Sequence, residues 1–341
     1  MTTTAATLRP IGAPGAEPRQ LENFVMGDWV AGTGRMTDLV HAVTGAKIAE
    51  TSTGGVDFRG MTEYARRVGG VALRKMTFHE RALMLKAMAQ YLMSRKDEFY
   101  VVSAATGATK QDSWVDIEGG IGTFFAYASR GRREFPNERF YVEGPTEMLS
   151  KGGSFVGRHI CVPLEGVAVH INAFNFPVWG MLEKLAPTLL AGVPAIVKPA
   201  TVTSYLTEAV FRAMIEAGLF PPGAVQLLCG SAGDLLDHLD CQSAVAFTGS
   251  ASTGKMLKTL PAIVEQNVRF NMEADSLNYS MLGPDAAPGT AGPGDGGAAQ
   301  GARQLPVPRA PDRARTAVRT VWRDAAGGCA YCRVGEWDSQ R

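Results

Sequence analysis

The sequence predicts an α/β fold in which helices cover both faces of a parallel sheet. In the second half of the chain, apolar runs of strand length alternate with segments of helix length. The strand-like runs are 166–174, 195–199, 225–230, 244–249 and 268–275, and the helix-like segments between the first four are 181–191, 204–217 and 232–239. This alternation is typical of parallel sheets. Ligands of such sheets bind beyond the carboxyl ends of the strands, so the site residues are expected there.

The preceding part, 21–150, is predicted to be largely helical after a strand-like segment around 24–30. In the motif TFHE, Thr77 and Glu80 have the spacing of a capping box, in which each side chain bonds the other residue's backbone amide. The helix that follows carries one apolar stripe, formed by Met84, Leu85, Met88, Tyr91 and Leu92. A stripe of this kind is typical of a helix that packs on a core.

A second helix is predicted over 112–128. Three glycines in it permit the close approach of a neighbouring element: Gly119, Gly120 and Gly122.

Polar turns follow three of the predicted strands. Asn172 and Asn175 follow the first strand, and Lys198 follows the second. After the fourth, in FTGSASTG, two glycines bracket a turn that should open a helix with Ser250 at its N-cap. Backbone amides at a helix start bind anions, and a lysine on the adjacent strand adds a positive charge. Each turn alone is a weak signal, but three together at successive strand ends indicate a nucleotide site.

The last predicted strand ends with two acidic residues, Glu273 and Asp275. A carboxylate at the end of a buried strand is costly unless it is paired or acts as a base. For Glu273 the local sequence leaves a catalytic base and a solvated strand end equally open. For Asp275 we expect a surface cap.

The motifs NAFNFP, VKPA, FTGSASTG and MEADSLN, in this order and spacing, resemble those of the aldehyde dehydrogenase superfamily. The stretches TGATKQDSWVDIEGGIGTFFAYAS, HINAFNFPVWGMLEKLAPTLLAGVPAIVKPAT and CGSAGDLLDHLD are similar to the dehydrogenase half of bifunctional phenylacetic acid degradation enzymes. Those enzymes join a ring-opening hydratase domain to an NADP-dependent dehydrogenase for a CoA-linked semialdehyde. The resemblance covers 21–285. It implies an aldehyde dehydrogenase-like fold with a Rossmann-type parallel sheet that is incomplete at the C-terminus.

The resemblance also implies residue roles. Asn175 matches the amide that stabilises the developing oxyanion, and Glu273 matches the general base. Lys198 matches the lysine at the adenosine ribose, and the turn containing Ser250 matches the pyrophosphate turn. The residues expected to bind the coenzyme are Ala173, Phe174, Lys198, Thr201, Gly230, Gly249, Ser250 and Gly254.

Thr201 decides the expected coenzyme. Many NAD-using relatives carry a glutamate two residues past the proline of KPA, and this chain carries Thr201 there. Without a carboxylate in the ribose pocket, a 2′-phosphate is not repelled. We therefore expect NADP to be preferred, with NAD as a possible second coenzyme.

The cysteine that serves the family as nucleophile has no counterpart in the expected place. The sequence has no cysteine between Glu273 and Cys329, and Cys329 and Cys332 lack the family's flanking residues. Cys161, Cys229 and Cys241 lie on or beside predicted strands, where we expect packed, inert thiols. Asn175 and Glu273 can assist a thiolate but cannot replace it, so we expect the 341 residues to be inactive.

The composition changes abruptly near residue 285. Segment 286–341 has eight arginines, no lysine and no Ile or Phe, so it is too poor in apolar side chains to fold alone. We expect this segment and 1–20 to be disordered, with 21–150 as the helical part of a coenzyme domain and 151–285 as its Rossmann-like core. The amino-acid composition of this segment is the one expected when GC-rich coding DNA is translated in a wrong reading frame. A natural flexible linker is the alternative.

Charge and cysteine content restrict the partners. With 34 basic and 33 acidic side chains, the chain has no general attraction for nucleic acid or anionic membranes. Five cysteines and the absence of a secretory signal favour the cytoplasm.

No metal site is expected, since the Cys329–Cys332 pair has no second ligand pair. The expected substrate is a CoA-linked aldehyde. The family forms homo-oligomers, but we expect its oligomerisation elements to be missing from this sequence.

Three hypotheses remain. The chain is a truncated, inactive semialdehyde dehydrogenase of phenylacetate catabolism or of the related benzoyl-CoA pathway. Alternatively, a reading-frame error conceals an active enzyme, in which case resequencing the codons after Asp285 would restore a Gly-Gln-x-Cys segment. The third hypothesis is a non-catalytic nucleotide-binding or interaction module with a basic disordered tail.

Overall fold

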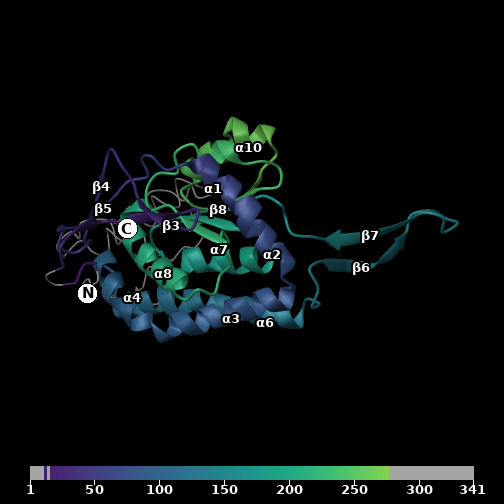
Figure 1. Cartoon of the computed structure of the whole chain (residues 1–341), viewed down its shortest axis with the longest axis horizontal. Helices are drawn as coiled ribbons and strands as arrows, with labels where there is room; N and C mark the ends of the chain where they lie inside the picture. Colours follow the sequence, from purple (N-terminus) through teal and green to yellow (C-terminus); the bar gives the residue numbers. More distant parts are fainter. Residues whose placement is uncertain (1–10, 14–15, 276–341) are drawn as a thin grey trace, which may run out of the picture. The chain divides into compact units, whose positions relative to one another are not determined.

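The computed structural model describes residues 11–13 and 16–275. Its main element is a seven-stranded sheet with the order β12-β11-β8-β9-β10-β2-β3 (Figure 1). Five neighbouring strands are parallel and correspond to the five predicted runs: β8 (Ala168–Ile171), β9 (Ala195–Lys198), β10 (Val225–Leu227), β11 (Ala244–Gly249) and β12 (Arg269–Ala274). The predicted parallel sheet is confirmed.

The order of these strands reverses beside β8. The chain runs from β8 through β9 to β10 in one direction, then crosses back to place β11 and β12 on the other side of β8. Ile171 of β8 lies in register with Lys198 of β9 and with Phe247 of β11. Crossover connections leave β8 and β11 in opposite directions. In sheets with this topology, ligands usually bind at the carboxyl ends of the two strands.

Helices cover both faces of the sheet, as the sequence predicts. Ile196 packs in one core with Val169 and Leu235, whereas its neighbours Ala195 and Val197 pack in the other. The first core lies under α1 (Phe58–Tyr64), η1 (Ala65–Gly70), η5 (Leu235–His238), α9 (Ala251–Lys258) and α10 (Pro261–Glu265). The second lies under α2 (Val71–Lys75), α3 (Phe78–Ser94), α4 (Lys96–Ser103), α6 (Gly120–Arg133), α7 (Trp179–Leu190) and α8 (Ser204–Glu216).

Two of the three predicted crossover helices form, as α7 and α8. The third segment, 232–239, contains only the short 3₁₀ helix η5. Gly233 has a φ of 50°, outside the right-handed helical region, and interrupts the segment. The prediction of a full helix there is wrong.

The predicted start of α3 is confirmed. Thr77 accepts a hydrogen bond from the backbone N–H of Glu80, whose carboxylate accepts one from the backbone N–H of Thr77. The apolar stripe of α3 is buried, with Tyr91 half-buried.

The second predicted helix consists of three consecutive parts: α5 (Lys110–Trp114), the π turn η3 (Val115–Gly119) and α6. The 3₁₀ turn η2 (Ala104–Thr106) precedes it. A Cβ on Gly119 or Gly120 would lie within 2.8 Å of Trp179 atoms, so both glycines permit the predicted close approach. Among the described residues, nothing lies within 4 Å of the position that a Cβ on Gly122 would take, so its predicted role is wrong.

The N-terminal region adds short strands. The strand-like segment at 24–30 is a hairpin of β2 (Glu22–Val25) and β3 (Asp28–Ala31), turned by Met26 and Gly27 at positive φ. A separate sheet joins β1 (Arg19–Gln20), β5 (Lys47–Thr51) and β4 (Thr37–Val40). Because Arg19 and Gln20 pair with β5, the ordered chain begins before residue 21, within the segment expected to be disordered.

A third sheet is the hairpin of β6 (Tyr141–Met148) and β7 (Val156–Cys161), which extends away from the layered body (Figure 1). Its apolar side chains are exposed, among them Met148, Phe155 and Ile160. No helix in the described part of the chain is long and apolar enough to cross a membrane.

The described residues up to Ala274 belong to one compact unit. The expected disorder of 286–341, the expected boundary at 285 and the expectation for 1–10 fall outside the described residues.

Candidate functional site

The loop after β8 carries the two predicted amides. Asn172 is buried, and its backbone N–H donates to the carbonyl oxygen of Lys198 over 3.0 Å. Neither end of its side-chain amide has a partner among the described residues. Ala173, Phe174 and Asn175 follow, each half-buried, so Asn175 can meet a ligand while Asn172 is enclosed.

Contacts from three elements hold this loop. The hydroxyl of Thr203 donates to the carbonyl oxygen of Phe174 over 3.3 Å. The hydroxyl of Thr207 donates to the carbonyl oxygen of Pro177 over 3.1 Å. The carboxylate of Asp116 accepts from the backbone N–H groups of Val178 and Trp179, over 3.1 and 2.8 Å. Sequence reasoning missed Asp116, because its partners lie more than sixty residues away.

Lys198 ends β9 and is half-buried. No hydrogen bond or ion pair joins its amino group to another described residue. Burial lowers the pKa of Lys198 from 10.5, and nearby Cys229 partly opposes this shift. A cation with little hydration and no partner is suited to bind a phosphate or a ribose hydroxyl.

Thr201 and Gly230 follow β9 and β10. Thr201 begins the 3₁₀ helix η4 (Thr201–Thr203) and is half-buried, within a turn that carries no carboxylate. Gly230 is buried, and a Cβ there would lie 3.1 Å from a methyl carbon of Thr53. Gly230 is thus explained by packing against the segment at Thr53, independently of any ligand.

The turn after β11 has the predicted form. Ser250 is the N-cap of α9, and its hydroxyl accepts from the backbone N–H of Thr253 over 3.2 Å. A Cβ on Gly254 would lie 2.5 Å from the sulfur of Met272, and one on Gly249 2.7 Å from the ring of Phe247. The two glycines therefore allow α9 to begin close against β11 and β12, at the carboxyl end of β11.

Glu273 lies on β12, directly across from Thr248 of β11. Its side chain is exposed, and its Oε2 accepts a hydrogen bond from the Thr248 hydroxyl over 3.1 Å. The carboxylate is therefore both solvated and oriented at the edge of the sheet where β11 ends.

The described cysteines differ from expectation in two of three cases. Cys229 is buried, its thiol donates to the carbonyl oxygen of Glu22, and burial raises its pKa well above 9.0, so this thiol is inert. Cys161 and Cys241 are exposed and not packed, because each lies at the end of a strand or in the loop before one. Cys329 and Cys332 lie outside the described residues.

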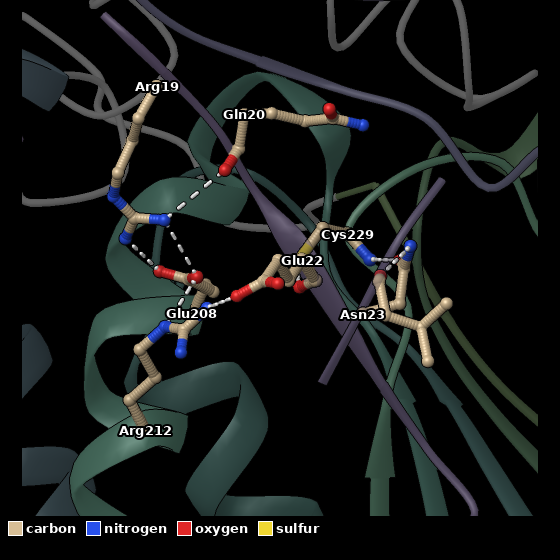
Figure 2. Close-up of polar contacts among 8 residues, drawn as sticks. Arg19, Gln20, Glu22, Asn23, Glu208, Arg212 and Cys229 are labelled. Carbon is tan, nitrogen blue, oxygen red and sulfur yellow. Dashed lines mark hydrogen bonds and ion pairs between the residues drawn. The ribbon is translucent and has the colours of Figure 1, made fainter. Parts of the chain in front are cut away.

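An ion-pair network around one buried carboxylate was also missed (Figure 2). Glu208 of α8 is fully buried and accepts from Arg19 at 2.6 Å and from Arg212 at 2.7 Å. Arg212 also pairs with Glu22 at 2.7 Å. The available signal was an acidic residue on the apolar stripe of α8 with an arginine four positions later.

Taken together, the carboxyl ends of β8, β9 and β11 bring three groups to one edge: an amide, a helix start and a cation that has no partner in the described part of the chain. This donor set fits a dinucleotide, with the cation and helix start for its phosphates and ribose. Among the described residues, no cluster of three histidine, cysteine or acidic side chains could hold a metal ion.

Sequence comparison gives the family. A model described as the aldehyde dehydrogenase family matches residues 29–290. The 3,4-dehydroadipyl-CoA semialdehyde dehydrogenase of Aromatoleum evansii is 45% identical over 80% of this chain and 53% of the relative. The alpha-ketoglutaric semialdehyde dehydrogenase of Bacillus subtilis is 29% identical over 77% and 53%. The chain thus spans about half the length of these relatives.

Solved structures share the fold. Betaine aldehyde dehydrogenase from Staphylococcus aureus, in complex with NAD⁺, matches with a TM-score of 0.61 at 21% identity, over 74% of this chain and 49% of that one. A NAD-dependent benzaldehyde dehydrogenase from Corynebacterium glutamicum matches with a TM-score of 0.62 at 20% identity, over 74% and 54%.

Proposed function

The chain belongs to the aldehyde dehydrogenase family, and from this premise we propose that its fold binds NADP for the oxidation of a CoA-linked semialdehyde to the carboxylic acid. The observation that carries the proposal is Lys198, whose amino group has no partner among the described residues, at the same sheet edge as Asn175 and Ser250. A dinucleotide lying across this edge would meet all three.

Each residue then has a distinct task. Lys198 and the start of α9 bind the adenosine side and the phosphates. Asn175 donates its amide N–H to the oxygen of the reacting carbonyl as negative charge develops there. Glu273, oriented by Thr248, accepts a proton at the exposed edge. When bound, NADP would accept the hydride from the adduct that forms when a thiolate adds to the aldehyde carbon. Among the described residues, no thiol suited to that addition lies at this edge.

The preference for NADP rests on Thr201. With a hydroxyl and no carboxylate at the turn after β9, a ribose 2′-phosphate meets no like charge, and Lys198 attracts it. Thr201→Glu should weaken NADPH binding and leave NADH binding equal or tighter, measured by fluorescence titration. An unchanged ratio of the two affinities would contradict this assignment.

The substrate assignment follows the resemblance and a relative's name. The relative at 45% identity is named for a CoA-linked semialdehyde, 3,4-dehydroadipyl-CoA semialdehyde. We propose a substrate of this class, formed in the catabolism of phenylacetate or, as the alternative, in the benzoyl-CoA pathway. The CoA-linked semialdehydes of the two pathways, supplied to an active relative of this branch, would separate these alternatives.

The 341 residues alone are proposed to bind coenzyme without turnover. No cysteine lies between Cys241 and Cys329, and the thiol of Cys229 is buried and inert. A burst of NADPH from the purified chain mixed with NADP and a CoA-linked semialdehyde would refute this.

Although the sequence led us to expect that the family's oligomerisation elements are missing, we further propose that the chain self-associates through the β6–β7 hairpin. The support is the exposure of its apolar side chains over both strands.

A further inference from the structure

Helix α7 has no capping side chain of its own. Its N-cap residue is Val178, whose side chain makes no capping hydrogen bond. The cap comes from Asp116, which is 5% exposed and accepts from the backbone N–H groups of Val178 and Trp179. A buried carboxylate at a helix N-terminus is stabilised by these donors and by the helix dipole, so the contact is a strong one.

The backbone around Asp116 is fitted to this contact. Asp116 lies in the π turn η3, which interrupts the helical run from Lys110 to Arg133. π turns of this kind often occur at functional sites. Gly119 ends this turn and Gly120 follows it. Both lie so close to Trp179 that a Cβ on either would clash with it. Hydrogen bonds and close packing therefore hold the turn against the start of α7.

This contact fixes one end of the loop that carries Asn175. The other end is fixed where Asn172 donates to the carbonyl oxygen of Lys198. No hydrogen bond or ion pair joins the Asn175 side chain to another described residue, so contacts to the loop backbone set its position. Between the two ends, Thr203 and Thr207 hold the loop through the carbonyl oxygens of Phe174 and Pro177. Val178 is only three residues beyond Asn175.

We propose that Asp116 is the positioning residue of the Asn175 loop. By occupying the amides at the start of α7, Asp116 also keeps coenzyme phosphates away from this helix end, which leaves them to Lys198 and α9. The loop then meets the nicotinamide half of the coenzyme. This inference rests on the proposed coenzyme function and adds to it the residue that sets the geometry of that half of the site.

The test compares two ligands on the full chain: NADPH, and adenosine 2′,5′-bisphosphate, which has the adenosine half alone. Asp116→Ala should weaken NADPH binding about tenfold and change bisphosphate binding less than about twofold, because only NADPH reaches the loop. Asp116→Asn keeps one acceptor oxygen and should give an intermediate NADPH affinity. Glu118→Gln is the matched control, since Glu118 of the same π turn bonds Lys96 and Tyr100 instead. It should bind both ligands as the wild type does.

The outcomes separate this inference from the proposed function. Equal loss of both ligands in Asp116→Ala and Asp116→Asn would show a general structural role and overturn the inference. Unchanged NADPH binding in both variants would also overturn it. If Asp116→Ala does not fold, Asp116→Asn decides by the same two-ligand comparison. A wild-type chain that binds neither ligand would overturn the proposed coenzyme function, and the positioning role with it.

Discussion

The backbone N–H of Asn172 donates a hydrogen bond of 3.0 Å to the carbonyl oxygen of Lys198. This bond joins the loop after β8 to the end of β9, next to the in-register pair of Ile171 and Lys198. The cation and the Asn175 loop are therefore parts of one rigid edge.

Lys198 should be the most readily modified lysine. Burial lowers the pKa of its amine from 10.5, so at about pH 8 a larger fraction is uncharged and nucleophilic than at an exposed lysine. Pyridoxal 5′-phosphate followed by borohydride should label Lys198 before Lys86, and bound NADPH should suppress the labelling. Peptide mass spectrometry measures both. Equal labelling of the two lysines, with no protection by NADPH, would contradict the assignment.

His170 should make the fold sensitive to acid. Its ring is buried against Thr188, and burial, with a smaller contribution from the charge of Lys184, lowers its pKa from 6.5 to about 3. The unfolded chain takes up a proton below about pH 6.5 and the folded chain does not, so stability is complete above that pH and falls toward pH 3.

A variant isolates this effect. Between about pH 8 and pH 5, the wild type should lose about 2 kcal/mol more of its free energy of unfolding than His170→Gln, which keeps a partner for Thr188. Urea unfolding curves at the two pH values give the difference. Parallel pH dependences of the two proteins would show that His170 does not remain neutral in the fold.

Glu208 should be a major contributor to stability. Its carboxylate is fully buried between Arg19 and Arg212 (Figure 2). Glu208→Ala removes the partner that the two guanidinium groups share, leaves Arg212 with Glu22 alone, and should cost about 3 kcal/mol in urea unfolding. Glu216→Ala, at an exposed position of the same helix, should cost less than about 1 kcal/mol. Similar losses in the two variants would contradict a special role for the buried network.

The β6–β7 hairpin should mediate self-association. Phe155→Ser combined with Ile160→Ser removes two side chains that are 64% and 58% exposed, and should shift sedimentation velocity profiles toward the monomer. Val264→Ser, which removes a side chain that is 62% exposed on α10, is the matched control and should leave the profile unchanged. An identical profile for the hairpin variant and the wild type would exclude this surface.

Sequence predicted the features that depend on nearby residues. The strands, the capping box of Thr77 and Glu80, and the N-cap at Ser250 all follow from local patterns. Features that depend on distant partners were missed. Glu208 pairs with Arg19 across 189 positions, and Asp116 caps a helix 62 positions away. The exposure of Cys161 was also missed, because a strand-like pattern does not show that its hairpin leaves the core.

Arg81 illustrates the same limit. It is fully buried in α3, and its guanidinium group donates to the carbonyl oxygen of Leu190, 109 positions away. Leu190 is the last residue of α7, so this bond satisfies a carbonyl group at the C-terminal end of that helix. Burial lowers its pKa to about 10. In the sequence it resembles any solvent-facing arginine of an amphipathic helix, so only the tertiary fold identifies it.

Calorimetric titration of the full chain with NADPH and with NADH tests the proposed coenzyme site most directly. We predict one NADPH site per chain, with an affinity about tenfold or more above that for NADH, because Lys198 and Thr201 accept the 2′-phosphate. No binding of either coenzyme, or NADH binding as tight as NADPH binding, would contradict it.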